Sequence, residues 1–158
     1  MSDKGMTIKL KIWRQARGSA QGSFHDYVVE NVQKEMSFLE MLDILNEQLV
    51  ANGEEGLEFD NDCREGICGT CGLVIDGVAH GTHAACTTCE VRMRSYSDGA
   101  TITVEPFRAD PFPIIKDLVV DMEPFFEKYR SIKPYFISYE PDPPVERYQS
   151  PKDRALFD

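Results

Sequence analysis

The sequence predicts an α+β fold in which one helix lies across a small sheet. Three observations support this: alternating apolar and polar residues near the N-terminus, an amphipathic stretch that opens on a capping motif, and short apolar runs joined by Asp-Gly turns. At 158 residues, the chain is expected to divide into a domain at 1–107 and an appendage at 108–158.

Two strands are expected first. Residues 7–13 (TIKLKIW) alternate apolar and polar side chains, which predicts a half-buried strand. A turn with Gly18 and Gly22 follows, and residues 24–29 then predict a second strand that forms a hairpin with the first.

A helix is predicted next, because Ser37 and Glu40 have the spacing of a capping box. Gly53 lies just beyond its expected end. Four apolar residues recur at helical spacing, and we expect them in the core: Phe38, Leu42, Leu45 and Leu49.

Further strands are expected at residues 73–75 and 78–79, which flank the hairpin dipeptide Asp76-Gly77, and at 101–105, which ends at Pro106. Strands with a single helix across them make a β-grasp domain. The glycine-rich loop at 63–72 is then expected on one rim of the sheet.

The appendage, residues 108–158, has a different sequence pattern. Apolar residues at helical spacing predict a helix over 114–122, with Asp110 as a possible N-cap, and Pro124 predicts a kink or a new start. Aromatic residues at 125, 126 and 129 continue an apolar face. Repeated prolines predict an extended connector over 131–158.

Composition narrows the function classes. The net charge is -10, from 17 basic and 27 acidic residues, which argues against a nucleic-acid surface. Surplus acid is typical of electron carriers that dock on basic partners, but it also simply keeps a protein in solution. No apolar run approaches the ~20 residues that span a bilayer, so we expect no insertion into a membrane by the chain itself.

The most specific motif is the loop CREGICGTCG at 63–72. Its cysteines, Cys63, Cys68 and Cys71, are separated by four and then two residues, and further cysteines follow at 86 and 89. This is the plant-type spacing for a [2Fe-2S] cluster held by four thiolates. Glycines at 66, 69 and 72 let the backbone turn its N–H groups toward the sulfurs.

Other interpretations of the cysteines remain open. A structural zinc site is less favoured because such sites usually have two close pairs separated by a longer loop. Disulfides are less favoured because the cysteine count is odd and the N-terminus is polar. His80 and His83 lie between the third and fourth cysteines, and they leave a Rieske-like site as a minor alternative.

Two cysteines compete as the fourth ligand. Alternation after Cys89 predicts that it begins a strand, whose base can hold a ligand rigidly. Cys86 stands in a loop-like context and is the alternative, with a small buried thiol as its ordinary role. We therefore favour Cys63, Cys68, Cys71 and Cys89. Arg64 inside the loop could shield the charge of a cluster, or it could be an ordinary exposed residue.

Several segments together resemble the iron–sulfur subunit of succinate dehydrogenase and fumarate reductase. They are CREGICGTCG, CEVRMRS, TITVEPFR and FPIIKDLVVDM, and the resemblance covers roughly residues 6 to 130. It adds weight to Cys89. It implies an electron-transfer subunit without catalytic residues of its own, in which a [2Fe-2S] cluster passes single electrons from the FAD of a flavoprotein subunit toward quinone.

The resemblance also implies partners and a location. Complete family members hold [4Fe-4S] and [3Fe-4S] clusters in a second domain and meet a membrane anchor with a quinone site. No cysteine follows Cys89, so we expect a fragment. The implied location is cytoplasmic, peripheral on the inner face of the cell membrane. The alternatives are a free-standing ferredoxin-like carrier, the [2Fe-2S] module of another oxidoreductase such as a molybdenum hydroxylase, and a zinc-stapled interaction module.

Overall fold

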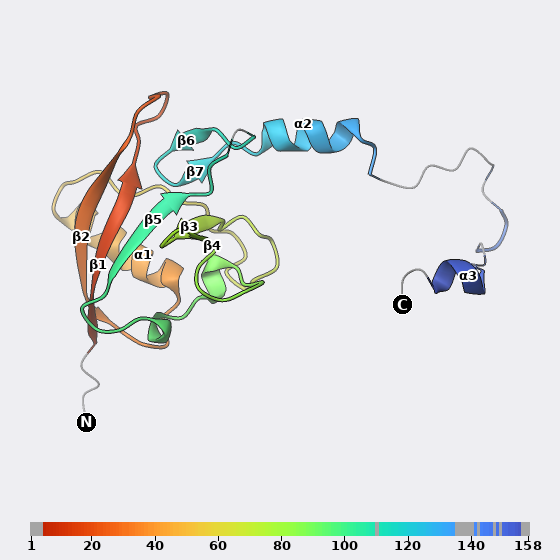
Figure 1. Ribbon diagram of the computed structural model, residues 1–158. Helices are drawn as coiled ribbons and strands as arrows, with labels where there is room; N and C mark the ends of the chain where they lie inside the picture. The colour runs from red at the N-terminus through yellow and green to blue at the C-terminus, as the bar shows by residue number, and fades with distance from the viewer. Residues whose placement is uncertain are drawn as a thin grey trace.

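The computed structural model describes residues 5–109, 111–134, 141, 143–146, 148 and 150–155. Within them, one sheet is built from β1 (Met6–Arg14), β2 (Ser23–Val32), β3 (Leu73–Ile75), β4 (Val78–Ala79) and β5 (Thr101–Pro106). Helix α1 (Phe38–Ala51) lies across it, so the α+β prediction is confirmed (Figure 1).

The strand order is β2-β1-β5-β3-β4. β1 and β2 form the predicted antiparallel hairpin, and β1 pairs in parallel with β5, with Leu10 opposite Ile102. The other pairings, β3 with β5 and β3 with β4, are antiparallel. A parallel pair at the centre needs a long crossover, and this crossover contains α1 and the cysteine loop.

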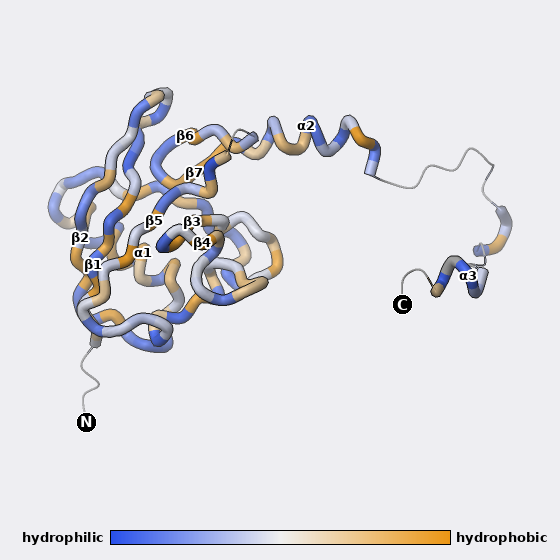
Figure 2. The backbone as a smooth tube through the Cα atoms, in the orientation of Figure 1, coloured by the Kyte–Doolittle hydropathy of each residue, from blue (hydrophilic) through white to orange (hydrophobic). Residues whose placement is uncertain are grey.

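The core lies between the sheet and α1. Ile8 and Ile12 on β1 are 0% exposed, as are Leu42 on α1 and Val104 on β5. Figure 2 shows the alternation of hydrophobic and hydrophilic residues along the strands that produces this burial. Each such side chain contributes roughly 1.5–3 kcal/mol to the stability of the fold when fully buried. The core therefore holds in place the sheet and the helix from which the cysteine loop extends.

The predicted capping box opens α1. The Ser37 hydroxyl accepts from the Glu40 backbone N–H at 3.2 Å, and the Ser37 N–H donates to the Glu40 carboxylate at 2.6 Å. That bond from the Ser37 backbone lowers the pKa of Glu40. The Phe38 N–H also donates to the Val91 carbonyl at 2.8 Å, which ties the start of α1 to the segment that follows Cys89.

The predicted helix over 114–122 is wrong. These residues form a hairpin of β6 (Ile114–Lys116) and β7 (Val119–Val120). Asp117 stands at the first position of the two-residue turn with a φ of +46°, in the left-handed region that hairpin turns of this kind require. The β-branched residues on both sides favour strands over a helix.

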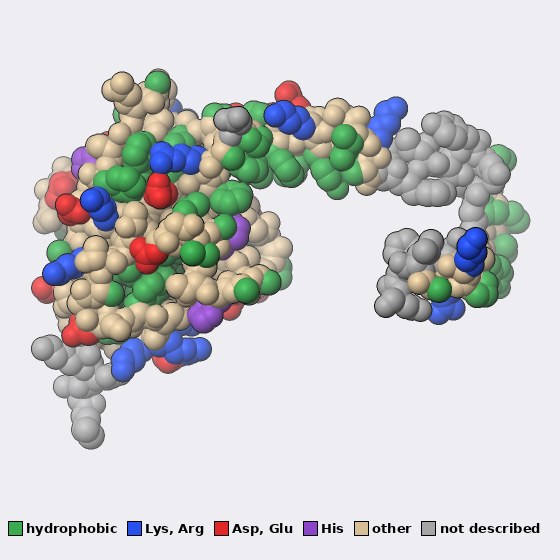
Figure 3. All heavy atoms as spheres, viewed as in Figure 1, with side chains coloured by type: hydrophobic (Ala, Val, Ile, Leu, Met, Phe, Trp, Pro, Cys, Tyr) green, Lys and Arg blue, Asp and Glu red, His purple; other side chains and the backbone are tan. Residues whose placement is uncertain are grey.

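Helix α2 (Glu123–Ser131) has Pro124 in its first turn. The prediction that a new helix starts at Pro124 is therefore confirmed. Phe112 packs on Phe125 with ring centroids 5.6 Å apart. Hydrophobic side chains gather along one side of α2 (Figure 3). Phe126 and Tyr129 on this helix are exposed.

The connector expected over 131–158 falls only partly within the described residues, where Pro151–Arg154 forms the short helix α3 instead. Asp110 lies outside the described residues. The boundary expected at residue 107 stays a prediction. None of the helices in the described part is long and apolar enough to cross a membrane.

Candidate metal centre

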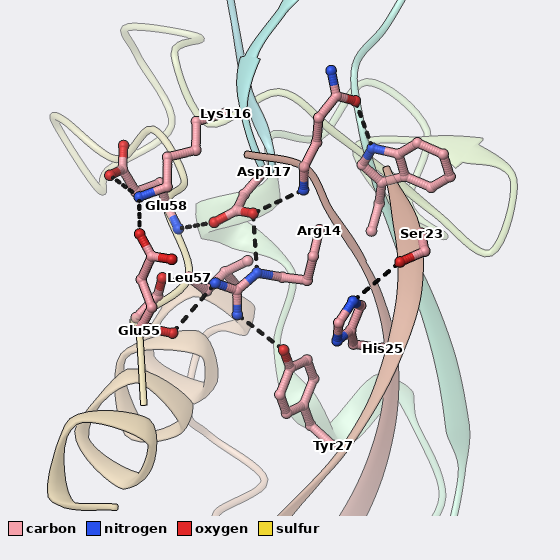
Figure 4. Close-up of polar contacts among 12 residues, drawn as sticks. Arg14, Ser23, His25, Tyr27, Glu55, Leu57, Glu58, Lys116 and Asp117 are labelled. Atoms are coloured by element: carbon pink, nitrogen blue, oxygen red, sulfur yellow. Dashed lines mark hydrogen bonds and ion pairs between the residues drawn. The ribbon is translucent and has the colours of Figure 1, made fainter. Parts of the chain in front are cut away.

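A buried polar network fixes the chain just before the cysteine loop (Figure 4). Asp117 is 2% exposed, and its carboxylate accepts from Arg14 Nε at 3.0 Å, from the Gln15 N–H at 3.0 Å and from the Glu58 N–H at 3.1 Å. On the other side, the Asn46 amide bonds both the N–H and the carbonyl of Leu57, at 2.6 and 2.9 Å. Residues 57–58 are therefore held between α1 and the β6–β7 hairpin.

The loop itself is tied to α1 through Arg64. Its guanidinium forms a bidentate ion pair with the Asp43 carboxylate, in which Nη1 donates to Oδ2 and Nη2 donates to Oδ1 at 3.0 Å. The same guanidinium donates to the Asn61 side chain at 2.7 and 3.2 Å. Arg64 has a φ of +56°, so these contacts hold a residue whose backbone is strained. Besides the two roles left open for Arg64, the structure shows a third, that of an anchor between the loop and α1.

Glycine is required at Gly66. Its φ is +77°, and a Cβ atom there would lie 3.1 Å from Cγ of Glu90. The loop therefore packs closely on the segment that carries Cys89. Within the loop, the N–H groups of Glu65 and Cys68 point at Sγ of Cys63, at 3.5 and 3.4 Å, which are donors of the kind that stabilise metal-bound thiolates.

The structure places the four favoured cysteines as two separate pairs. The thiols of Cys63 and Cys68 interact within the loop, and the thiol of Cys71 interacts with that of Cys89 from the other segment. Cys71 and Cys89 are 4% and 2% exposed, whereas Cys68 is exposed and Cys63 half-buried. One pair therefore faces water and the other faces the core.

The two environments shift the pKa values of Cys68 and Cys71 in opposite directions. A hydrogen bond from the Thr70 hydroxyl, with further donors from the loop, lowers the pKa of Cys68 to about 7. Burial raises the pKa of Cys71. Thiolate is the form that binds metals, and the lowered pKa of Cys68 favours that form.

Cys89 does not begin a strand, as the sequence had predicted. It lies in the 3₁₀ helix η1 (Thr88–Glu90), which is followed by a second one, η2 (Met93–Ser95). Alternation of buried and exposed residues continues through Val91 and Met93, which explains the error. Cys86 is half-buried, and its thiol donates to the Thr87 carbonyl at 3.3 Å.

The two histidines lie in other contacts. His83 Nε2 is 2.9 Å from the Ser95 hydroxyl, and the His80 ring packs on Phe107 with centroids 5.0 Å apart. A cavity of about 280 Å³ beside the loop is lined by His80, Cys68 and Phe126 among others, so the start of α2 lies next to Cys68.

Sequence reasoning missed two residues at this site, Thr70 and Thr87. Each hydroxyl lies 3.2 Å from a cysteine sulfur, that of Thr70 from Cys68 and that of Thr87 from Cys89. The one signal in the sequence was that both threonines stand within two residues of a cysteine.

The donor set fits a two-iron cluster. In a [2Fe-2S] cluster with four cysteine ligands each iron takes two thiolates, and the four sulfurs here lie as two pairs joined by one loop. Within the described part of the chain, the structure gathers no three His, Cys, Asp or Glu side chains into one metal-binding group, so the two cysteine pairs are separate in it.

The chain is similar to known iron–sulfur proteins. The family model of the 2Fe-2S iron-sulfur cluster binding domain matches residues 9–127. The chain is 38% identical over 96 residues to the succinate dehydrogenase iron-sulfur subunit of Coxiella burnetii, covering 61% of this chain and 37% of that protein. It is 34% identical over 155 residues to the mitochondrial succinate dehydrogenase [ubiquinone] iron-sulfur subunit 1 of Oryza sativa subsp. japonica, covering 96% and 50%.

A solved structure is similar as well. A chain of the Mycobacterium smegmatis Sdh1 complex in the apo form matches with a TM-score of 0.70 and 30% identity, over 92% of this chain and 54% of that chain. The chain thus spans about half or less of the length of these relatives. Since the family model covers most of the sequence, the chain belongs to the family of 2Fe-2S iron-sulfur cluster binding domains.

Proposed function

We propose that Cys63, Cys68, Cys71 and Cys89 hold one [2Fe-2S] cluster. The observation that carries the proposal is the pairing of the thiols, Cys63 with Cys68 and Cys71 with Cys89. Backbone N–H groups of the loop donate to Cys63, and burial of Cys71 and Cys89 keeps water from the inner pair. Cys86 is left outside the ligand set, because its thiol bonds the backbone next to it.

The bound cluster supplies reversible one-electron storage. The chain's own residues bind it, orient it and screen its inner side, and no acid, base or nucleophile of the chain is needed. We infer that the chain transfers electrons as part of the iron–sulfur subunit of a succinate dehydrogenase or fumarate reductase. The similarity to succinate dehydrogenase iron-sulfur subunits from two organisms supports this role.

The proposed role includes partners. A flavoprotein subunit with FAD would exchange electrons with this cluster. The [4Fe-4S] and [3Fe-4S] clusters and the contact with a quinone-binding membrane anchor would belong to the part of the relatives that this chain does not span. The assembled complex would then lie on the inner face of the cell membrane.

Single cysteine variants test the ligand set. After anaerobic reconstitution with iron and sulfide, Cys63→Ser, Cys68→Ser, Cys71→Ser and Cys89→Ser are each expected to lose the visible absorption of the cluster or to shift it strongly. Cys86→Ser is the matched control, because it changes a neighbouring thiol, and it is expected to retain the wild-type spectrum. Loss of the cluster in Cys86→Ser with retention in Cys89→Ser would contradict the assignment.

Co-purification tests the subunit role. A tagged chain, expressed in its native host, is expected to bring down a larger protein with a covalently bound flavin. A chain that carries a cluster but purifies alone, under conditions that preserve complexes, would instead support the free-standing carrier.

A further inference from the structure

Each cysteine pair receives one threonine hydroxyl. Thr70 Oγ1 lies 3.2 Å from Sγ of Cys68, in the outer pair. Thr87 Oγ1 lies 3.2 Å from Sγ of Cys89, in the inner pair. The two threonines belong to different segments, the loop and the stretch before η1, so each pair has its own hydroxyl.

The direction of these hydrogen bonds is fixed once metal is bound. A thiol can either donate to or accept from a hydroxyl, but a thiolate that binds iron has no proton left to donate. In the loaded protein, the hydroxyls of Thr70 and Thr87 are therefore the donors. A hydrogen bond to a charged acceptor is stronger than one between neutral groups.

We propose that Thr87, and to a smaller extent Thr70, are positioning residues that raise the reduction potential of the cluster. The proposal rests on the cluster ligation proposed above. Reduction adds one electron, with no bond made or broken, and places more negative charge on the sulfurs. A donor aimed at a sulfur then stabilises the reduced form more than the oxidised form, which raises the potential.

The two threonines differ in how far they are buried. Thr87 is half-buried and its acceptor Cys89 is 2% exposed, so water has little access to replace a lost hydroxyl there. Thr70 and Cys68 are both exposed, so water can take the place of the hydroxyl. A hydrogen bond in the drier environment is also electrostatically stronger. The larger effect is therefore expected from Thr87.

The adjacent residue provides a matched control. Thr88 is 0% exposed, and its hydroxyl has no hydrogen-bond partner among the described residues. Thr88→Val and Thr87→Val make the same chemical change at neighbouring positions, but only the second removes a hydroxyl that contacts a cysteine sulfur.

The test is a redox titration of the reconstituted chain, with dithionite as reductant and the paramagnetic signal of the reduced cluster as the readout. Thr87→Val is expected to lower the equilibrium constant for reduction of the cluster about threefold to tenfold. For a one-electron couple this is a lowering of the reduction potential by about 28 to 59 mV. Thr70→Val is expected to have less than about a threefold effect, because water substitutes. Thr88→Val is expected to match the wild type, and Thr87→Ser, which keeps the hydroxyl, to stay near it.

Equal potentials for Thr87→Val and the wild type would overturn the inference, as would an equal shift in Thr88→Val. If Thr87→Val does not take up a cluster, Thr87→Ala removes the same hydroxyl without adding bulk and decides by the same criterion. A wild-type chain that binds no cluster overturns the proposed function itself, whereas a loaded wild type with an unshifted Thr87→Val overturns only the role of the hydroxyl.

Discussion

Arg14 and Asp117 form an ion pair of 3.0 Å that joins the end of β1 to the turn of the β6–β7 hairpin. Their side chains are only 14% and 3% exposed. Because Asp117 also accepts from the Glu58 N–H, the pair braces the stretch that leads into the cysteine loop. The β6–β7 hairpin, although it lies in the predicted appendage, thus helps to place the cysteine loop.

Removing this buried carboxylate is expected to destabilise the protein. Asp117→Asn keeps the size of the side chain and tolerates a positive φ, but it leaves the Arg14 charge without its partner. We expect the free energy of unfolding, measured by urea denaturation, to fall by about 2–4 kcal/mol.

An exposed ion pair nearby provides the control for Asp117→Asn. Arg17 and Glu58 lie 3.9 Å apart with side chains 70% and 44% exposed. Arg17→Met is expected to change the free energy of unfolding by no more than about 0.5 kcal/mol. Similar losses in Arg17→Met and Asp117→Asn would contradict the structural role given to the buried pair.

Arg64 is expected to control how firmly the loop holds its metal rather than how stable the domain is. Its contact with Asp43 is exposed, so Arg64→Gln should lower the free energy of unfolding by less than about 1 kcal/mol. A loop loosened by about 1 kcal/mol should lose iron to a chelator about fivefold faster.

The rate of iron loss from the reconstituted protein checks this. Arg130→Gln breaks another surface pair, with Glu123 on α2, whose side chains are more exposed, and should release iron at the wild-type rate. If Arg64→Gln loses iron at the same rate as Arg130→Gln, the contact of Arg64 with Asp43 does not affect how the loop holds iron.

Tyr96 is expected to make the protein sensitive to alkali. Burial, with a contribution from Asp76, raises the pKa of Tyr96 from 10.0 to about 12. Between these values the unfolded state loses the phenol proton while the folded state keeps it, so stability is full below pH 10 and declines toward pH 12. The loss is on the order of 2 kcal/mol.

Tyr96→Phe removes this dependence. The Tyr96 hydroxyl is buried without a hydrogen-bond partner in the described part of the chain, so the substitution should cost little at pH 7. Urea denaturation of both proteins at pH 7 and pH 11 gives the comparison. Equal declines in the two proteins at pH 11 would exclude Tyr96 as the cause.

Local patterns predicted the first domain well, because its elements are specified by neighbouring residues. The alternation in β1, the capping box of Ser37 and Glu40, and the Asp76-Gly77 turn each act over a few residues, and the structure confirms all three. The spacing of the loop cysteines predicts a shared cluster site, and this stays a prediction that the cysteine variants test.

Two predictions failed where distant contacts decide the local structure. Apolar residues over 114–122 fit a helix by spacing, but Asp117 is held in a hairpin turn by bonds to residues at 14, 15 and 58. The β-branched residues at 114, 115, 119 and 120 were the available signal for strands in this segment. Cys89 similarly lies in a 3₁₀ helix because the chain there bonds the start of α1 through Val91, which the local alternation does not reveal.

The central claim is that the four cysteines hold two irons and two sulfides. Its most direct test is the iron and acid-labile sulfide content of the anaerobically purified or reconstituted chain, together with its electron paramagnetic resonance spectrum after reduction. The account predicts iron and sulfide in equal amounts, two of each per chain as the cluster type requires, and a rhombic signal from one unpaired electron. Zinc in place of iron, or iron without sulfide and without that signal, would contradict it.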